Sequence, residues 1–317
     1  MAEIPEPMHS IASLIDSYHE SVREDRRGHL GCSMLGHPCD RWLWLSFRWA
    51  VIEKFEGRIL RLFRRGQLEE HTIIKDLVSI GLQVRELDQQ ERVSFGWHVG
   101  GSIDAIIDRG VPESPERPHI AEFKTHSKKS FDELIAKGVE SAKKQHFVQM
   151  QLYMLGTGID RALYLAVCKD DDRIYTERVK FDEEVANRYL QRGYRIVQSE
   201  RMPQGISSNP SWYECKMCAA HEFCFSTRLT KEVNCRTCCH STPRVDDWLC
   251  ELHGDAIPPE FMLEGCDSHC LHPDLVPWEL NEDASTEHAP AYMIDGVPVL
   301  NGVGGVSSRE LIGRFAQ

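Results

Sequence analysis

The chain of 317 residues allows one large domain with a small one, or two modest domains. Its composition, 41% hydrophobic and 27% charged, is typical of a soluble globular protein. Its apolar runs are far shorter than the ~18 residues of a membrane span, and the net charge of −12 argues against a general nucleic-acid coat protein, which would be strongly basic. The N-terminus has no basic segment followed by an apolar core, so we expect no signal peptide, no membrane partner and a cytoplasmic protein.

The first third of the chain favours helices followed by strands. We expect helices over residues 8–28, from Cys39 to about Ala50, and over 57–80, where apolar residues recur at helical spacing and Gly81 ends the pattern. Strands are expected at 83–87 and in a hairpin of residues 93–99 and 102–108 that turns at Gly100-Gly101.

The middle of the chain continues this alternation. A short strand is expected at 119–125, a helix over 131–156, a strand pair at 161–169 and 173–181, and a helix over 182–200. The order predicts an α/β fold with a mixed central sheet flanked by helices.

The composition changes after about residue 210. Nine of the twelve cysteines fall between Cys215 and Cys270, and beyond residue 271 the only expected pairing is a hairpin around Asp295-Gly296. We therefore expect a domain of residues 1–229 and a small cysteine-rich module of residues 230–317. Without secretion, so many cysteines indicate metal or cluster ligation rather than disulfides.

One strand carries a candidate catalytic group. Alternation along residues 120–124 places Glu122 and Lys124 on one face, while Ala121 and Phe123 point into the core. Asp104, on the preceding strand, would converge with Glu122 on a metal ion. Carboxylate oxygens suit Mg²⁺ or Mn²⁺, and Lys124 could orient the attacking water of a phosphodiester hydrolysis. The simpler alternative is an exposed Glu122–Lys124 ion pair.

Three motifs resemble a known family. Asp104 with Glu122-Phe123-Lys124 resembles the catalytic motif of the PD-(D/E)XK nuclease superfamily, and Gln149 with Tyr153 resembles the Gln-x-x-x-Tyr motif of its RecB-like branch. The segment Arg65–His71 resembles that branch's upstream helical motif. The resemblance covers roughly residues 30–228 and implies a restriction-endonuclease-like core.

The same resemblance implies site residues. Gln149 and Tyr153 would contact DNA, and Glu70 would be a further metal ligand, with its neighbour His71 as a rival. The implied Mg²⁺ or Mn²⁺ ligands are Glu70, Asp104, Glu122 and Phe123.

The first cysteine cluster has the spacing Cys-x2-Cys-x5-Cys. Cys215, Cys218 and Cys224 need a fourth ligand, which is either His221 in a zinc site or the distant Cys39. Nucleases similar to the AddB helicase–nuclease subunit and the CRISPR-associated adaptation nuclease use one cysteine before the core and three after it to hold a [4Fe–4S] cluster. The resemblance thus favours a cluster that joins the two ends of the nuclease core, with Cys32 as a spare ligand. Cys168 lies inside an apolar strand, so we expect it to be a buried core thiol.

The second cysteine cluster predicts a zinc site. Short-spaced pairs of ligands across a turn are typical of Zn²⁺. We assign Cys235, Cys238, Cys250 and Cys266 as ligands; His253 and His269 compete for the fourth position, while Cys239 and Cys270 are surplus.

Basic and aromatic residues are interleaved between Arg41 and Arg65. Seven basic residues stand there against two acidic ones, and such a stretch could line a DNA groove. The aromatic residues could equally pack the core. Arg58, Arg61 and Arg65 are the better phosphate contacts.

These features favour a metal-dependent DNA exonuclease of phage or bacterial recombination, replication or processing, acting on free ends or single strands and working with proteins of those pathways. A structure-specific endonuclease and a catalytically idle nucleic-acid-binding adaptor are the alternatives, with redox sensing a remote one.

Overall fold

The computed structural model of the chain describes residues 10–22, 26–85 and 91–315. The chain divides into two compact units, each assembled from segments far apart in sequence. Unit 1 comprises residues 1–27, 54–93 and 101–187, and unit 2 comprises residues 28–53, 94–100 and 188–317. The expected division between residues 229 and 230 lies inside unit 2 and stays a prediction.

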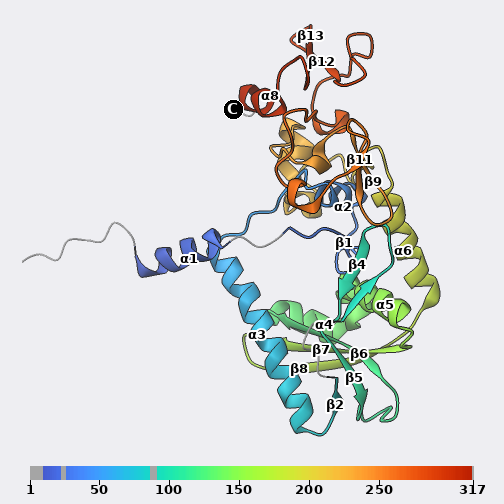
Figure 1. The fold of residues 1–317 in the computed structure, drawn as a ribbon. Coiled ribbons are helices and arrows are strands. Elements are labelled where there is room, and N and C mark those ends of the chain that lie inside the picture. The colour runs from blue at the N-terminus through green and yellow to red at the C-terminus, as the bar shows by residue number, and fades with distance from the viewer. Residues whose placement is uncertain (1–9, 23–25, 86–90, 316–317) are drawn as a thin grey trace, which may run out of the picture. The chain divides into compact units, whose positions relative to one another are not determined.

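Unit 1 is built around a five-stranded sheet in the order β2-β5-β6-β7-β8 (Figure 1). Its central pair, β6 and β7, is parallel, and the other three pairs are antiparallel. The strands are β2 (Gln83–Val84), β5 (Ala105–Arg109), β6 (His119–His126), β7 (Arg161–Cys168) and β8 (Ile174–Lys180). The predicted mixed sheet flanked by helices is confirmed. The expected strand 83–87 ends outside the described residues.

Helices cover both faces of this sheet. Helix α3 (Gly57–Ser79) packs Ile73 and Leu77 into an apolar cluster with Phe123 of β6 and Leu163 and Leu165 of β7. Helices α4 (Lys128–Ala142) and α5 (Lys144–Thr157) contact β6 and β7 as well. His146 of α5 bonds to Tyr164, which alternates with the two leucines, so α5 covers the face opposite α3. Helix α1 (Ile11–Ser21) packs on α3.

Two expected elements differ from the structure. Gly100 and Gly101 lie within strand β4 (Val99–Ser102), and the turn from β3 (Arg92–Ser94) is formed instead by residues 95–98. That turn is closed by bonds between Phe95, Gly96 and Val99, with positive φ at residues 96–98. The single helix expected over 131–156 is two helices, α4 and α5. Gly138 inside α4 has a positive φ of 72°, which an L-residue rarely adopts, and it interrupts the helical backbone there.

Unit 2 combines an N-terminal segment with the C-terminal part of the chain. Its aromatic residues Trp44, Phe47 and Trp49 are buried, and the guanidinium of Arg236 lies 3.8 Å from the ring centroid of Trp49. Core packing therefore accounts for these aromatic residues of the basic stretch.

The helices of the remaining chain are α2 (Asp40–Phe47), α6 (Glu183–Val197), α7 (Tyr213–Lys216), α8 (Ser308–Phe315) and the short turns η1 (Phe223–Thr227), η2 (Cys235–Thr237), η3 (Pro259–Phe261) and η4 (Pro273–Leu275). Strand β1 (Leu30–Gly31) pairs with β4. A second sheet contains β9 (Ser241–Pro243), β10 (Trp248–Cys250) and β11 (Asp255–Ala256). The remaining strands are β12 (Ala291–Ile294) and β13 (Val297–Leu300). The last two form the hairpin predicted at Asp295-Gly296, which is confirmed. Within the described residues, no helix is long and apolar enough to cross a bilayer.

Candidate active site and metal centres

Asp104, Glu122 and Lys124 meet where β5 and β6 pair. Ala105 lies opposite Ala121 in this antiparallel pair, so the preceding residue, Asp104, lies beside Glu122. Asp104 Oδ2 accepts a hydrogen bond from the backbone amide of Phe123 at 3.0 Å and lies 3.5 Å from Lys124 Nζ. The ammonium of Lys124 also contacts Oε1 of Glu122. The structure thus brings together the three residues that the sequence placed on neighbouring strands.

Glu122 is fully buried, which rules out the exposed ion pair considered above. Its Oε2 has no hydrogen-bond partner among the described residues. Burial, with a further contribution from Asp104, raises the pKa of Glu122 to about 8. Burial lowers the pKa of Lys124, but Glu122 and Asp104 outweigh it and raise the net value. A buried carboxylate with an unsatisfied oxygen is costly unless a cation satisfies it, so this donor set fits a hard divalent ion.

Glu70 of α3 reaches the same group. It lines a cleft of about 320 Å³ together with Lys124, Thr125 and Lys169. Burial and the nearby Asp104 raise the pKa of Glu70 to about 7, and Lys124 partly opposes this shift. The rival ligand His71 is exposed and does not line the cleft. The geometry therefore favours Glu70 over His71 as the further carboxylate.

Phe123 contributes to the site through its backbone. Its side chain is buried in the apolar cluster under α3, while its carbonyl accepts a hydrogen bond from Lys124 Nζ at 2.9 Å. That carbonyl is the atom through which Phe123 could ligate a metal.

Gln149 and Tyr153 lie in α5 and are buried. Gln149 Nε2 donates to the Tyr153 hydroxyl at 3.1 Å, and this hydroxyl donates to the carbonyl of Ser102 at 2.6 Å. The pair therefore anchors the chain two residues before Asp104. Contact with DNA stays a prediction.

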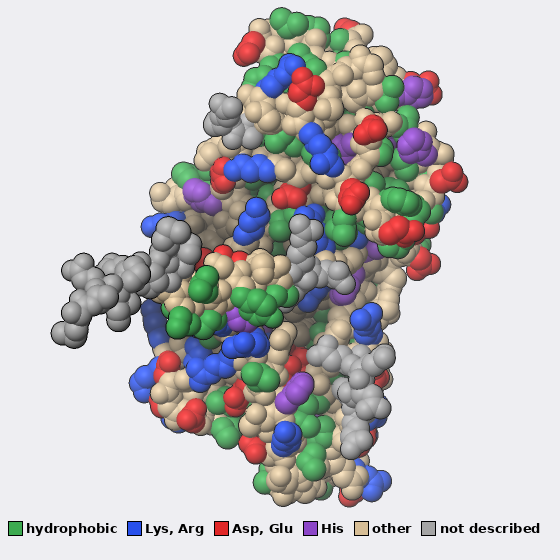
Figure 2. All heavy atoms as spheres, turned by 60° about the vertical axis from the view of Figure 1, so that its left-hand side comes forward, with side chains coloured by type: hydrophobic (Ala, Val, Ile, Leu, Met, Phe, Trp, Pro, Cys, Tyr) green, Lys and Arg blue, Asp and Glu red, His purple; other side chains and the backbone are tan. Residues whose placement is uncertain are grey.

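The three candidate phosphate contacts of α3 differ in their partners. Arg58 is exposed, and Arg65 is exposed with its Nη2 3.4 Å from the carbonyl of Lys169. Arg61 is half-buried and forms an ion pair with Asp16 of α1 at 3.0 Å. In Figure 2, Lys and Arg side chains gather on the face of unit 1 along which α1 and α3 run. Arg58 and Arg65 are thus freer than Arg61 to meet phosphates.

A polar network that was not predicted from the sequence surrounds Tyr164, the strand neighbour of Glu122. Tyr164 lies opposite Glu122 in the β6–β7 register. Its hydroxyl is 2.8 Å from His126 Nε2 and 2.9 Å from His146 Nδ1. Burial lowers the pKa of His126 to about 4 and of His146 to about 3, so both rings are neutral near pH 7. Two neutral histidines add no positive charge beside Lys124.

The first set of cysteines lies together in unit 2. Cys39, Cys215, Cys218 and Cys224 line one small cavity, which His221 also lines. Burial raises the pKa of Cys218 to about 11, and the nearby thiols of Cys39 and Cys224 add to the shift.

The spacing of these thiols bears on what they could hold. No three of the four sulfur atoms lie within 4.8 Å of one another in the part of the chain that the structure describes. A single zinc ion needs sulfur atoms about 3.8 Å apart, given Zn–S bonds of ~2.3 Å. A four-iron cluster holds each thiolate on a different iron and takes them further apart. His221, the alternative fourth ligand of a zinc site, has its Nε2 at 3.2 Å from the carbonyl of Pro210. An iron–sulfur cluster and a zinc ion both stay predictions at this site.

The second set is also gathered in unit 2. Burial raises the pKa of Cys235 to about 11, and the neighbouring Cys238, Cys266 and Cys250 add to the shift. These four sulfur atoms too lack a trio within 4.8 Å in the described ranges. The four sulfur atoms would have to move closer together to bind one zinc ion, and this zinc site stays a prediction. His269 bonds to Ser308 and Asn234, which leaves it engaged elsewhere.

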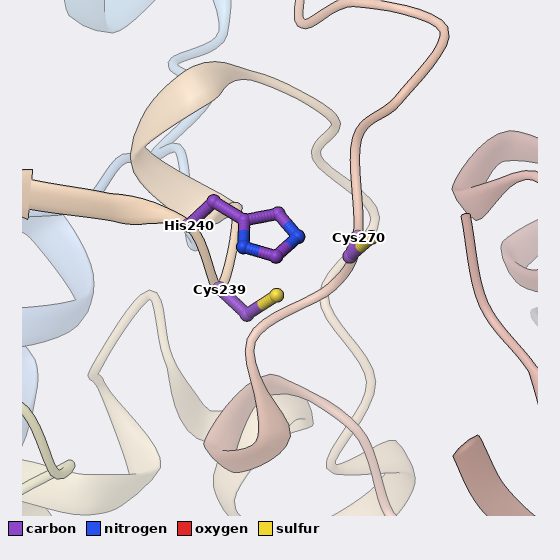
Figure 3. A group of neighbouring side chains, drawn as sticks. All are labelled: Cys239, His240 and Cys270. Atoms are coloured by element: carbon purple, nitrogen blue, oxygen red, sulfur yellow. The ribbon is translucent and has the colours of Figure 1, made fainter. Parts of the chain in front are cut away.

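Among the described residues, one group of three side chains has its potential metal-ligand atoms close together, and no role was assigned to it from the sequence. Cys239, His240 and Cys270 place their ligand atoms within 4.8 Å of one another (Figure 3). Cys239 and Cys270 were treated as surplus because they stand outside the short-spaced pairs. The only signal in the sequence was the density of cysteine and histidine.

Comparison with known proteins gives structural neighbours and one family match. None of the curated proteins matches the chain. Among solved structures, SSO0001 aligns with a TM-score of 0.41 and 16% identity over 66% of this chain and 91% of its own. The alkaline exonuclease LHK-Exo of Laribacter hongkongensis gives a TM-score of 0.38 and 18% identity over 54% of this chain and 87% of its own. A phage related exonuclease from Haemophilus somnus 129PT gives a TM-score of 0.38 and 21% identity over 54% and 92%.

A family model provides the assignment. The model described as the PD-(D/E)XK nuclease superfamily matches residues 36–225, which is more than half of the chain and includes Asp104, Glu122 and Lys124. The chain belongs to the PD-(D/E)XK nuclease superfamily.

Proposed function

We propose that this nuclease is a deoxyribonuclease that depends on Mg²⁺ or Mn²⁺ and degrades DNA from its ends. The observation that carries the proposal is the buried carboxylate of Glu122, whose Oε2 lacks a partner among the described residues and which lies beside Asp104 and Lys124. A hard cation would satisfy this oxygen and neutralise the surplus negative charge.

Asp104, Glu122, Glu70 and the carbonyl of Phe123 would hold the ion. A metal ion held there would supply polarisation of the scissile phosphate and hydroxide at neutral pH. Lys124 stays protonated and offsets the charge that develops on the phosphate. The bond from the Phe123 amide fixes the Asp104 carboxylate, so the site needs little rearrangement before reaction.

The cleft beside this group suits a phosphate chain. It runs past Glu70 and Lys124 to Lys169, and Arg65 lies next to Lys169. Basic side chains at the mouth of a cleft attract a DNA backbone. We infer that recombination, replication or genome processing in a phage or bacterium supplies such a substrate.

We further propose that Cys39, Cys215, Cys218 and Cys224 hold a [4Fe–4S] cluster, and that Cys235, Cys238, Cys250 and Cys266 hold a zinc ion. The shared cavity supports the first. The mutual proximity of the thiols supports the second. Both groups are structural in this proposal, because they join segments distant in sequence.

A direct test uses end-labelled linear DNA and closed circular DNA of the same sequence. Anaerobically purified protein should degrade the linear form with Mg²⁺ or Mn²⁺ and leave the circle intact, while Asp104→Ala degrades neither. Cutting of the circle would favour the structure-specific endonuclease. Binding without cleavage by the wild type would favour the idle adaptor.

A further inference from the structure

Two backbone segments of unit 2 bring Cys239, His240 and Cys270 together. Cys239 and His240 follow η2 and lead into β9, while Cys270 lies between η3 and η4. The amide of Cys239 donates to the carbonyl of Cys270 at 2.9 Å, and Cys238 forms an antiparallel bridge with Leu271. The proximity of the three side chains is therefore fixed by paired backbone.

The spacing of the three ligand atoms is close to that of a metal site. They all lie within 4.8 Å of one another. With Zn–S bonds of ~2.3 Å and Zn–N bonds of ~2.0 Å, the ligand atoms of a tetrahedral ion lie about 3.5–3.8 Å apart. A shift of roughly 1 Å would bring the three atoms onto one ion. Figure 3 shows the imidazole of His240 directed toward Cys270 and lying beside the sulfur atom of Cys239.

The surroundings of His240 suit a ligand. Its Nε2 lies 3.0 Å from the carbonyl oxygen of His288. Because a carbonyl oxygen only accepts hydrogen bonds, Nε2 carries the proton and donates it. A cation that displaces the proton on Nδ1 can then bind the lone pair of that nitrogen. Metal-binding histidines commonly donate their second ring N–H to a backbone carbonyl in this way.

The sulfur atom of Cys270 packs against the backbone of Gly302, where there is no room for a side chain. A Cβ at Gly302, whose φ is +114°, would lie 2.3 Å from Cys270 Sγ. Any other residue at 302 would displace the thiol. Cys270 itself is fully buried, whereas Cys239 and His240 are half-buried, so the group is open on one side.

We propose that Cys239, His240 and Cys270 bind a zinc ion, separate from the ion assigned to Cys235, Cys238, Cys250 and Cys266. Two thiolates and an imidazole are donors that zinc prefers. Three protein ligands leave one tetrahedral position for water or another donor. Binding releases to solvent the protons that the two cysteines and the histidine carry at the ligand atoms, so no oxidant or reductant is required.

The test is a metal count on the full-length chain, purified under reducing conditions. Zinc and iron per chain are measured by mass spectrometry for wild type, Cys239→Ser, His240→Ala and Cys270→Ser. We expect each variant to lose one zinc per chain relative to wild type. Cys168→Ser, which removes a buried thiol of β7 in unit 1, is the matched control and should lose none.

A second variant separates this site from its neighbour. Cys266→Ser should lose a different zinc, so Cys239→Ser/Cys266→Ser should lose two. Loss of only one ion by the double variant would show a single shared site and overturn the proposal. So would full zinc retention in the three single variants, or a Cys239–Cys270 disulfide in wild type.

A measurement on wild-type protein covers variants that fail to fold. Zinc is removed with a chelator and replaced by Co²⁺, whose visible absorption reports tetrahedral coordination with sulfur. Added Co²⁺ should saturate two sites in unit 2, and saturation at one would contradict the proposal.

Discussion

The carboxylate of Asp104 accepts a hydrogen bond from the backbone amide of Phe123, although the two residues are 19 positions apart in sequence. The bond ties the loop before β5 to the middle of β6. It holds the acid beside Glu122 before any substrate arrives. The arrangement leads to the first prediction.

Asp104→Asn should abolish nuclease activity while preserving the fold. The asparagine oxygen can still accept from Phe123, but the neutral amide is a poor ligand for a divalent ion. We expect a fall of roughly 100-fold or more in cleavage rate, with a melting temperature close to wild type. A near-normal rate in saturating Mn²⁺ would exclude Asp104 as a metal ligand.

Glu122 should make the metal-free protein less stable as pH rises. Its pKa is raised from 4.5 to about 8 in the folded chain, so the folded state holds a proton that the unfolded state releases. The stabilising contribution is complete below 4.5 and is lost as pH rises towards 8. Thermal melts in chelator across this window should show the decline, and Glu122→Gln should flatten it.

Added Mg²⁺ or Mn²⁺ should restore stability at the upper end of that window, because the ion binds the ionised carboxylates of the folded state only. Glu122→Gln should lose most of this stabilisation. Equal stabilisation of both proteins would place the ion elsewhere.

Tyr153→Phe should lower activity without weakening DNA binding. The substitution removes the bond to the Ser102 carbonyl, which positions the segment leading to Asp104. We expect a loss of about 1 kcal/mol in stability and a fall in kcat larger than any change in KM. Tyr175→Phe, which removes a bond to Glu177 in β8, is the matched control. A rise in KM alone would instead indicate DNA contact by Tyr153.

Arg58→Ala and Arg65→Ala should each reduce the salt dependence of DNA binding. Each phosphate contact contributes ~0.7–0.9 to the slope of log affinity against log salt. Arg61→Ala should change the slope less, since Arg61 pairs with Asp16. Filter binding in chelator at several salt concentrations measures the slopes, and equal changes for all three would refute the distinction.

Cys39→Ser should remove the proposed cluster. The wild type, purified anaerobically, should contain iron and sulfide and absorb near ~400 nm, as thiolate-bound iron clusters do. The variant should lose the band and the iron but keep its zinc. A wild type that holds zinc and no iron would favour the site formed with His221.

Residue alternation was enough to predict which side chains of the candidate catalytic strand share a face. Glu122 and Lys124 share a face because side chains in a strand alternate, and Phe123 between them enters the core. The same local logic misplaced the hairpin. Gly100 and Gly101 look like a turn in isolation, yet Val99 and Gly100 pair with Leu30 and Gly31, a partner far away in sequence.

Long-range partners also explain what the sequence left unassigned. The spacing of Cys235 and Cys238 is visible in the chain, whereas Cys239 meets Cys270 only because a backbone bridge joins their segments. The burial of a polar side chain also cannot be predicted from the neighbouring residues in the sequence. Gln149 and Tyr153 share a helix face as predicted, but only the packed structure shows that this face points to Ser102 rather than to solvent.

The discontinuous make-up of the two units has a consequence for synthesis on the ribosome. Every segment of unit 1 has been made once residue 187 is added, whereas unit 2 needs the last part of the chain. Cys39 precedes Cys215 by 176 residues, which is roughly 9–35 s of translation at ~5–20 residues per second. Throughout that interval Cys39 has been synthesised but the other three proposed cluster ligands have not. Its protection then depends on the reducing state of the surroundings, so oxidative stress during synthesis should lower the yield of complete protein more than the same stress afterwards.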